Sequence, residues 1–179
     1  MKRLTSFGMV LGLAALLLAA APWAAVHSGG QPPADQNGST EPLAIIVNRS
    51  NPVDGLSMLE LRRVFLGERK HWANDRRITL VMREPGEPER KVILRDVYQM
   101  NEDQLKNHFI HGLFTGEILV SPKILATPTG VRKFVFNVPG AIGYVRASDL
   151  DDTVKVLRID ELLPEDGGYK LRVEVRVAK

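Results

Sequence analysis

Two arginines in the middle of the chain stand where a strand is expected to end and a helix to begin. Arg83 follows the apolar run Ile78–Met82, and Arg90 falls in the first turn of the helical pattern that comes next. A guanidinium presents its N–H donors as a planar fork, which matches two oxygens of an oxyanion. Asn48 ends another apolar run and adds an amide donor. These three side chains are candidate ligands of an anion.

The loop between the two arginines supplies a fourth candidate, Gly86. The loop spans residues 84–88 and leads directly into the helix that carries Arg90. The N–H groups at a helix amino terminus are free to bind phosphate or another anion. In α/β sheets, ligands bind outside the carboxyl ends of strands. We therefore predict a cleft around Asn48, Arg83 and Gly86.

Each of these donors also has an alternative role that needs no ligand. Arg83 could form an ion pair within its own segment, where carboxylates would disfavour a bound anion; these are Glu84, Glu87 and Glu89. Arg90 could be a solvated surface arginine. Asn48 could complete a turn with Asn51. The residue types alone leave both interpretations open.

Other titratable residues offer weaker chemistry. His108 and His111 lie three apart on a helical pattern, a spacing that can bind a metal with Asp103 as a third ligand. No fourth ligand stands at a fixed spacing, so surface histidines are the better interpretation. Ser57 is explained as a helix cap, and the chain has no Gly-x-Ser-x-Gly elbow, Walker loop or paired carboxylates. We therefore predict no catalytic residue, no metal and no cofactor, and a protein that is not an enzyme.

The elements that position the arginines are strands alternating with helices. Leu43–Asn48 and Ile78–Arg83 are continuous apolar runs, typical of strands that are buried on both faces. A third strand, Ala141–Val145, follows a tight turn at Pro139-Gly140, where glycine tolerates a positive φ. Gly143 within that strand indicates another group passing close to the backbone. The alternation predicts an α/β sandwich.

Two helices have clear starting signals. Ser57 with Glu60, and Asn101 with Gln104, fit the capping-box pattern. The second helix carries an amphipathic stripe of Leu105, Phe109, Ile110, Leu113 and Phe114. We also expect Trp72 to anchor its charged loop onto the core. Tyr144 could stack on a ligand, but packing in the core is the better interpretation.

The last third of the chain gives weaker signals. Residues 118–127 are expected to be irregular. Thr129 could cap a short helix, although the same segment fits a strand. Thr153–Ile159 is another strand candidate. Apolar and charged residues alternate from Leu171 to Val177, which predicts a half-exposed strand at a sheet edge.

Composition restricts the classes of partner. The chain has 179 residues, 44% hydrophobic and 25% charged, with a net charge of +3. Such a balance is ordinary for a globular domain and does not provide the basic surface that nucleic acid requires. The absence of cysteine excludes disulfides and thiol chemistry. We therefore expect no nucleic-acid partner.

The amino terminus indicates export. Lys2 and Arg3 precede an apolar stretch from about Phe7 to Val26, and small residues near Ala25 offer a cleavage site. We predict a signal peptide over residues 1–25, with an uncleaved inner-membrane anchor as the alternative. Residues 26–42 are polar and rich in Gly and Pro, which predicts a flexible linker. The remaining 43–179 form one domain, expected in the periplasm.

An ordered set of motifs resembles the phosphate-type substrate-binding proteins of ABC transporters, which have a periplasmic binding protein-like fold. In order, the motifs are Leu56-Ser57, Val64-Phe65-Leu66-Gly67, Trp72, a strand ending in Arg83, Phe114-Thr115-Gly116, Pro139-Gly140-Ala141-Ile142-Gly143-Tyr144-Val145 and Leu157-Arg158-Ile159-Asp160. The resemblance covers roughly Ala44 to Leu171, and the motif from Pro139 is the most specific. The resemblance implies a periplasmic binding protein-like α/β sandwich.

Two departures from the family pattern limit what the resemblance implies. Family members have two lobes that close on the anion, and this chain is similar mainly to the second lobe, as a short single-lobe version. Arg83 matches the family's arginine, but an acidic segment, residues 84–90, replaces the Ser-Gly-Thr cluster that follows it in the family. The arginine supports an anion site, whereas the carboxylates argue against one.

Two functional hypotheses follow. The first is an exported, phosphate-type substrate-binding-like protein that binds an inorganic oxyanion such as phosphate for ABC transport, beside a membrane transporter. The second is a non-catalytic accessory or interaction module of the periplasm that kept the fold and lost anion binding, with another periplasmic protein as its partner. The resemblance implies the fold more directly than it implies either function.

Overall fold

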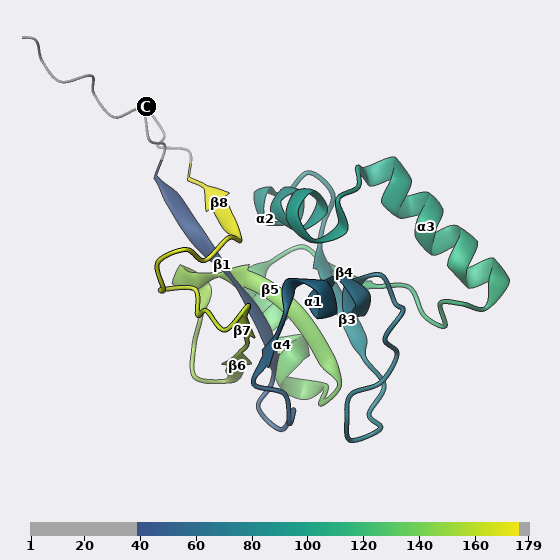
Figure 1. Cartoon of the computed structure of the whole chain (residues 1–179), viewed down its shortest axis with the longest axis horizontal. Coiled ribbons are helices and arrows are strands. Elements are labelled where there is room, and N and C mark those ends of the chain that lie inside the picture. Colours follow the sequence, from purple (N-terminus) through teal and green to yellow (C-terminus); the bar gives the residue numbers. More distant parts are fainter. Residues whose placement is uncertain (1–38, 176–179) are drawn as a thin grey trace, which may run out of the picture. The chain divides into compact units, whose positions relative to one another are not determined.

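A mixed β-sheet with helices on both faces forms the body of the protein (Figure 1). The computed structural model describes residues 39–175, so the predicted signal peptide and the predicted linker as far as residue 38 lie outside the described residues. The strands are β1 (Thr40–Asn48), β2 (Gly55–Leu56), β3 (Thr79–Arg83), β4 (Lys123–Leu125), β5 (Ala141–Arg146), β6 (Val154–Val156), β7 (Arg158–Ile159) and β8 (Arg172–Glu174). The helices are α1 (Met58–Phe65), α2 (Pro88–Val92), the π-helix η1 (Ile93–Tyr98), α3 (Glu102–Thr115), α4 (Pro128–Asn137) and the 3-10 helix η2 (Ala147–Asp149).

The directions of the central strands decide which residues share an edge of the sheet. The order is β4-β3-β5-β1-β6, and β8 pairs with the first residues of β1. β3 runs parallel to β4 and β5, whereas β1 runs antiparallel to β5. The carboxyl end of β3 therefore lies at the same edge as the carboxyl end of β5 and the amino-terminal part of β1.

Side chains of β1 alternate between two apolar cores. Leu43, Ile45 and Val47 join the larger core, which α1, η1 and α3 complete. Ala44 and Ile46 pack with α4 in the smaller core on the other face. The strand is thus buried on both faces, and the predicted α/β sandwich is confirmed.

Several local predictions are confirmed because they depend on short-range geometry. Both capping boxes form, at Ser57 and at Asn101. The buried Trp72 donates from Nε1 to the carbonyl of Gly140 at 3.0 Å, which anchors its loop. Val131 Cγ1 lies 3.0 Å from the position of a Cβ on Gly143, so α4 is the group that passes close to this strand.

The turn before β5 needs glycine for a reason other than the one expected. Gly140 does not have a positive φ. Instead, the carbonyl oxygen of Arg77 occupies the space that a Cβ at this position would need. The amide of Thr79 also donates to the Gly140 carbonyl at 3.0 Å, which ties the turn to β3. Close backbone approach, and not a left-handed conformation, requires glycine here.

Several predicted boundaries differ from the structure. β1 begins at Thr40, inside the predicted linker, because its first residues pair with β8. Thr127, and not Thr129, caps α4, with Pro128 in the first turn. The expected irregular segment contains β4, and the strand expected over Thr153–Ile159 divides into β6 and β7. The last strand, β8, is a half-exposed edge, as predicted, and it ends at Glu174, whereas Val177 of the predicted range lies outside the described residues.

Candidate functional site

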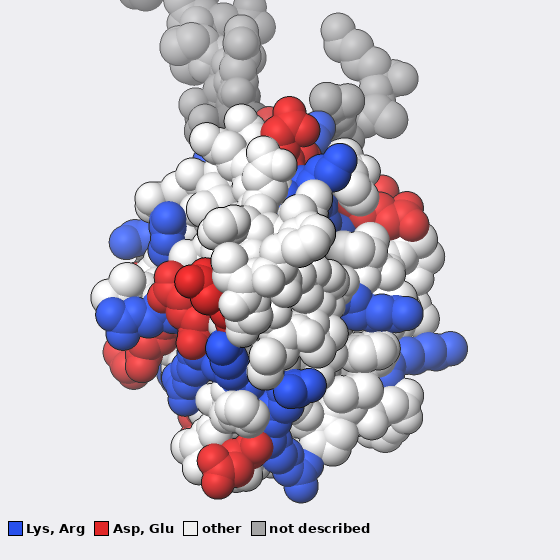
Figure 2. Space-filling view, turned by 90° about the vertical axis from the view of Figure 1, so that its right-hand side faces the viewer, with Lys and Arg blue, Asp and Glu red and all other residues white. Residues whose placement is uncertain are grey.

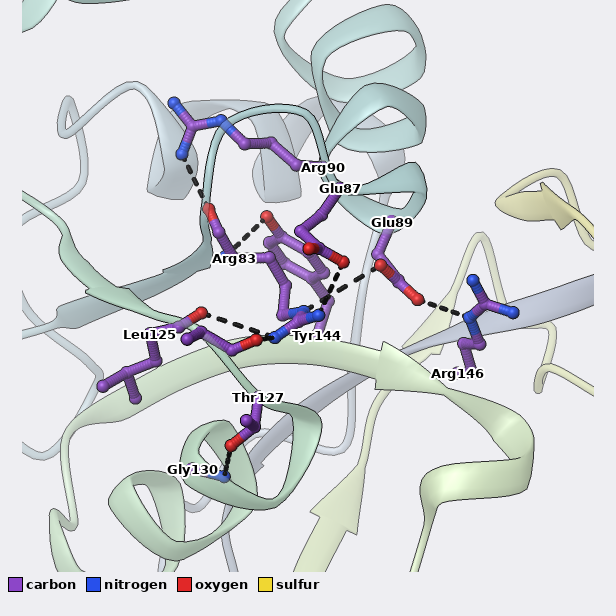
Figure 3. Close-up of polar contacts among 10 residues, drawn as sticks. Arg83, Glu87, Glu89, Arg90, Leu125, Thr127, Gly130, Tyr144 and Arg146 are labelled. Atoms are coloured by element: carbon purple, nitrogen blue, oxygen red, sulfur yellow. Dashed lines mark hydrogen bonds and ion pairs between the residues drawn. The ribbon is translucent and has the colours of Figure 1, made fainter.

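Arg83 is buried at the carboxyl end of β3, and its guanidinium binds groups of the chain itself. The side chain is 6% exposed and binds the Glu87 carboxylate at 2.7 Å. Its Nη1 donates to the carbonyl of Ala126 and, at 3.5 Å, to that of Leu125. Figure 3 shows these groups converging on the guanidinium from opposite sides. The ion pair weighed as an alternative is therefore formed, and anion binding by Arg83 stays a prediction.

A second carboxylate extends this cluster. Glu89 is 3% exposed, and its Oε2 lies 3.9 Å from Nε of Arg83. Its other oxygen accepts a hydrogen bond from Arg146 (Figure 3). Arg146 also faces Glu41 at 3.6 Å. The bond with Glu89 raises the pKa of the Arg146 guanidinium. Charges of both signs thus neutralise one another at this edge of the sheet.

Arg90 forms a closed set of contacts, although it is buried beside the loop. Nε and Nη2 bind the two carboxylate oxygens of Glu102 at 2.8 and 2.7 Å, a bidentate pair. Nη1 donates to the carbonyl of Arg83 at 2.9 Å. Burial acts to lower the pKa of Arg90, but the Glu102 carboxylate raises it, and the net shift is upward. Arg90 is therefore a buried residue that connects α2 with β3 and α3. It is not the solvated surface arginine considered as an alternative.

Tyr144 lies in the core and contacts the backbone next to the arginine. Its hydroxyl accepts a hydrogen bond from the Arg83 amide at 3.0 Å, and its ring is fully buried. Burial raises its pKa well above the usual value, so the hydroxyl stays neutral at physiological pH. The core interpretation of Tyr144 is confirmed, and the hydroxyl fixes the end of β3.

Asn48 lies at the opposite edge of the sheet from Arg83. Because β1 runs antiparallel to β3, the carboxyl end of β1 meets the amino-terminal end of β5. The Asn48 amide donates to the carbonyls of Val135 and Phe136 at the end of α4 and accepts from Ser50. The predicted cleft joining Asn48 with Arg83 and Gly86 is therefore not formed.

Gly86 borders an open groove at the carboxyl ends of β3 and β5. It has a φ of +92°, and no atom lies within 4 Å of the place that a Cβ would take, so its backbone is freely accessible. The groove has a volume of about 460 Å³ and passes between α2 and β8. Its cationic lining consists of Lys91, Arg95, Arg146 and Arg172, and its acidic lining is Glu174.

Two of the four cations already have carboxylate partners. Arg95 binds Asp96 at 2.6 Å, and Arg146 binds Glu89. Within residues 39–175, Lys91 and Arg172 form no ion pair, and Arg172 donates to the Thr40 hydroxyl at 3.0 Å. Sequence patterns alone did not reveal this groove, because its two walls come from segments about 80 residues apart. Arg172, which alternates with apolar residues in the last strand, was the signal in the sequence that could have indicated one wall of the groove.

His108 and His111 have different surroundings on α3. His108 contacts the carbonyl of Leu66 through Nε2 at 2.9 Å, and His111 is exposed on α3. The described part of the chain contains no group of three His, Asp or Glu side chains placed to hold a metal. In the same residues, no helix is both long and apolar enough to span a membrane.

Comparison with known proteins gives concordant matches. A family model described as a PBP superfamily domain matches residues 27–175. The phosphate-binding protein PstS of Bacillus subtilis (strain 168) is 30% identical over 128 residues, which are 69% of this chain and 37% of that protein. This chain therefore spans little more than a third of that relative.

Solved structures share the fold at lower identity. A Clostridium perfringens protein assigned to the phosphate ABC transporter substrate-binding proteins, solved with bound phosphate, has a TM-score of 0.62 at 22% identity. The match covers 75% of this chain and 54% of that chain. PstS from Borrelia burgdorferi has a TM-score of 0.61 at 13% identity, over 76% and 56% of the two chains. The motif resemblance and the periplasmic binding protein-like fold are thus confirmed. This chain belongs to the family whose model is described as a PBP superfamily domain.

Proposed function

We propose that this chain is an exported, non-catalytic binding module that captures an inorganic oxyanion such as phosphate for a membrane transporter of the ABC type. The observation that carries the proposal is the groove beside Gly86, where four cationic side chains and one carboxylate line an open volume of about 460 Å³. The 30% identity to a phosphate-binding protein supports the same ligand class. The relative is longer, so capture and transport by this chain are our proposal.

The groove suits a small, multiply charged anion. Lys91 and Arg172 form no ion pair within residues 39–175, so an anion between them would add contacts without displacing a carboxylate. The exposed backbone of Gly86 allows a ligand to approach closely. Because the groove is open to water, we expect modest affinity that falls as salt is added.

Arg83 and Arg90 have a positioning role in this proposal. Arg83 binds the Glu87 carboxylate, and Arg90 binds the carbonyl of Arg83. These contacts fix the loop and the start of α2, the helix that carries Lys91. A phosphate could reach the Arg83 fork only by displacing Glu87, whose side chain is 36% exposed. Asn48 lies at the other edge and is not part of the proposed site.

The test is isothermal titration of the full chain with phosphate, sulfate and molybdate at low salt. We expect saturable binding of at least one oxyanion, weakened about tenfold or more in K91A and in R172A, since each removes one charged contact. K133A removes an exposed lysine from α4, away from the groove, and should leave the affinity unchanged. No binding by a sample shown to be folded, or an equal loss in all three variants, would overturn the proposal.

A further inference from the structure

A second surface, formed by α3 and the segment that follows it, is apolar and exposed. We call it the α3 face; it consists of Ile110, Leu113, Phe114, Leu119, Val120 and Ile124. Phe114 is 88% exposed and Val120 56%, although both are large apolar residues. Figure 2 looks onto the side of the molecule where α3 lies in Figure 1, and a broad area without charged side chains runs down its middle. A contiguous patch of this kind marks an interaction site more often than isolated apolar residues do.

The α3 face arises because α3 has two apolar sides and the core covers only one. Leu105 and Gly112 are buried, and Phe109 packs against the larger core. Ile110, Leu113 and Phe114 have the i, i+3, i+4 spacing of a separate helical stripe, which faces away from that core. The amphipathic stripe read from the sequence therefore combines a buried side and an exposed side.

The exposed side is held in place by a buried anchor. Ile118 is 6% exposed and packs so tightly on Gly112 that a Cβ there would lie 2.6 Å from its side chain. The Ile118 amide also donates to the Gly112 carbonyl at 2.9 Å. This contact folds the segment back onto the helix and leaves the next two residues, Leu119 and Val120, outside. The α3 face is thus preorganised, which lowers the entropy lost when a partner binds.

A groove of about 480 Å³ runs between α3 and β4 and continues the α3 face. Its apolar lining includes Met82, Leu105, Phe109 and Pro122. β4 is the last strand of the described sheet on this side, so its outer backbone edge has no strand partner within residues 39–175. An edge strand can pair with the same strand of another molecule about a twofold axis.

The charges around the groove favour a neutral partner. Its charged lining is Arg90, Glu102, Asp103 and Lys106, with two residues of each sign. Arg90 and Glu102 are paired with each other. An anionic lipid surface would need an excess of basic residues here, whereas a surface of zero net charge does not repel its own copy.

The apolar area of the α3 face is a large part of what a self-association interface buries. Six side chains exposed by 40–88% offer on the order of 500 Å² of apolar area, before the groove and β4 are added. A standard interface buries about 800 Å² on each partner. The α3 face supplies more than half of that area, and the remaining groove lining and the backbone edge of β4 lie beside it.

From these observations we propose that the α3 face is the contact surface between two copies of this chain, related by a twofold axis next to β4. The second copy covers Phe114 and its neighbours and fills the groove. This proposal is independent of the oxyanion groove, which lies between α2 and β8.

The first test is the mass of the full chain in solution across about a hundredfold range of concentration, measured by analytical ultracentrifugation. We expect the wild type to reach twice the mass of one chain, and F114E to remain monomeric, because a carboxylate would be buried without a partner. F136E changes an equally large aromatic residue, 54% exposed on α4, and should leave the dimer intact. A wild type that is monomeric throughout, or a dimer that F136E breaks and F114E does not, would overturn the proposal.

The second test uses the absence of cysteine from the chain. Variants F114C and L113C each carry one thiol on the α3 face, and oxidation should link them into disulfide dimers. L59C and F136C carry a thiol at exposed apolar positions elsewhere and should cross-link far less. Equal cross-linking of all four variants would indicate random collision and reject the α3 face. Binding of the wild type to neutral lipid vesicles, with no dimer in their absence, would assign the surface to a membrane instead.

Discussion

The charged cluster at the carboxyl end of β3 and the apolar outer side of α3 differ in whether other residues of the chain contact their side chains. In the cluster around Arg83 each charged group faces one of opposite sign, although Nε of Arg83 and Oε2 of Glu89 are buried without a hydrogen bond. Along α3, no described residue covers Phe114.

This difference indicates where association can lower the free energy. An anion that binds Arg83 must replace Glu87, so a carboxylate is exchanged for another anion and the net gain is small. A protein surface that covers Phe114 removes apolar area from water without displacing anything. The region that looks most like a binding site by residue type is therefore the less open of the two.

The largest expected effect comes from breaking the charged cluster. R83M should lower the free energy of unfolding by about 3–5 kcal/mol, because it leaves the buried Glu89 with only Arg146 and orphans the carbonyls of Leu125 and Ala126. Urea unfolding followed by circular dichroism measures the change. R63A, an exposed position on α1, should change stability by less than about 0.5 kcal/mol.

A second variant separates the loss of charge pairing from a loss of packing. R83M combined with E89L removes both buried charges and should recover part of the lost stability. If the double variant is no more stable than R83M, the cost of R83M comes from packing and carbonyl contacts. Charge pairing in the cluster around Arg83 would then contribute little to the stability of the protein.

The next effect is the pH dependence of stability that two buried tyrosines, Tyr98 and Tyr144, should cause. Burial raises the pKa of Tyr98 and of Tyr144 above the unfolded value near 10. Above pH 10 the unfolded chain loses these protons while the folded chain keeps them, so stability falls as pH rises. The expected slope is about 1.4 kcal/mol per pH unit for each tyrosine.

The urea midpoint measured between about pH 9 and pH 11.5 tests this slope. Y98F removes one buried hydroxyl and should make the decline shallower. Tyr98 donates to the carbonyl of Phe65 at 3.0 Å, so Y98F will also be somewhat less stable at pH 7. An identical pH profile in the two proteins would show that the pKa of Tyr98 is the same in the folded and the unfolded chain, which contradicts the prediction.

The sequence predicted the three central strands, β1, β3 and β5, and two helix caps because their signals are local, whereas it missed β4 and the division between β6 and β7. Buried strands appear as continuous apolar runs, and both capping boxes are read from residues three apart. Thr127 was missed in favour of Thr129, although Pro128 in the first helical turn was an available signal. Such errors shift a boundary without changing the fold.

The candidate site was predicted less well because it depends on strand direction. Asn48 and Arg83 both end apolar runs, but no local pattern says that β1 runs against β3 and carries Asn48 to the other edge. Likewise, Lys91 and Arg172 meet across the groove only through the pairing of β8 with β1. Long-range pairing, and not residue type, decided which donors share a site.

The smallest expected effect on the isolated chain tests the other half of the comparison. In dilute protein, F114Q should change the free energy of unfolding by less than about 0.5 kcal/mol, because Phe114 is 88% exposed and glutamine is a good helix former. L105A, on the same helix but 2% exposed, should cost about 2–5 kcal/mol.

Concentration separates an exposed residue from an interface residue. If Phe114 is covered by a second copy, the thermal midpoint of the wild type should rise with protein concentration, since association stabilises the folded state by mass action. The midpoint of F114Q should stay constant over the same range. A wild-type midpoint independent of concentration would mean that α3 is exposed without a partner copy, and the contrast between the two regions would then be one of burial alone.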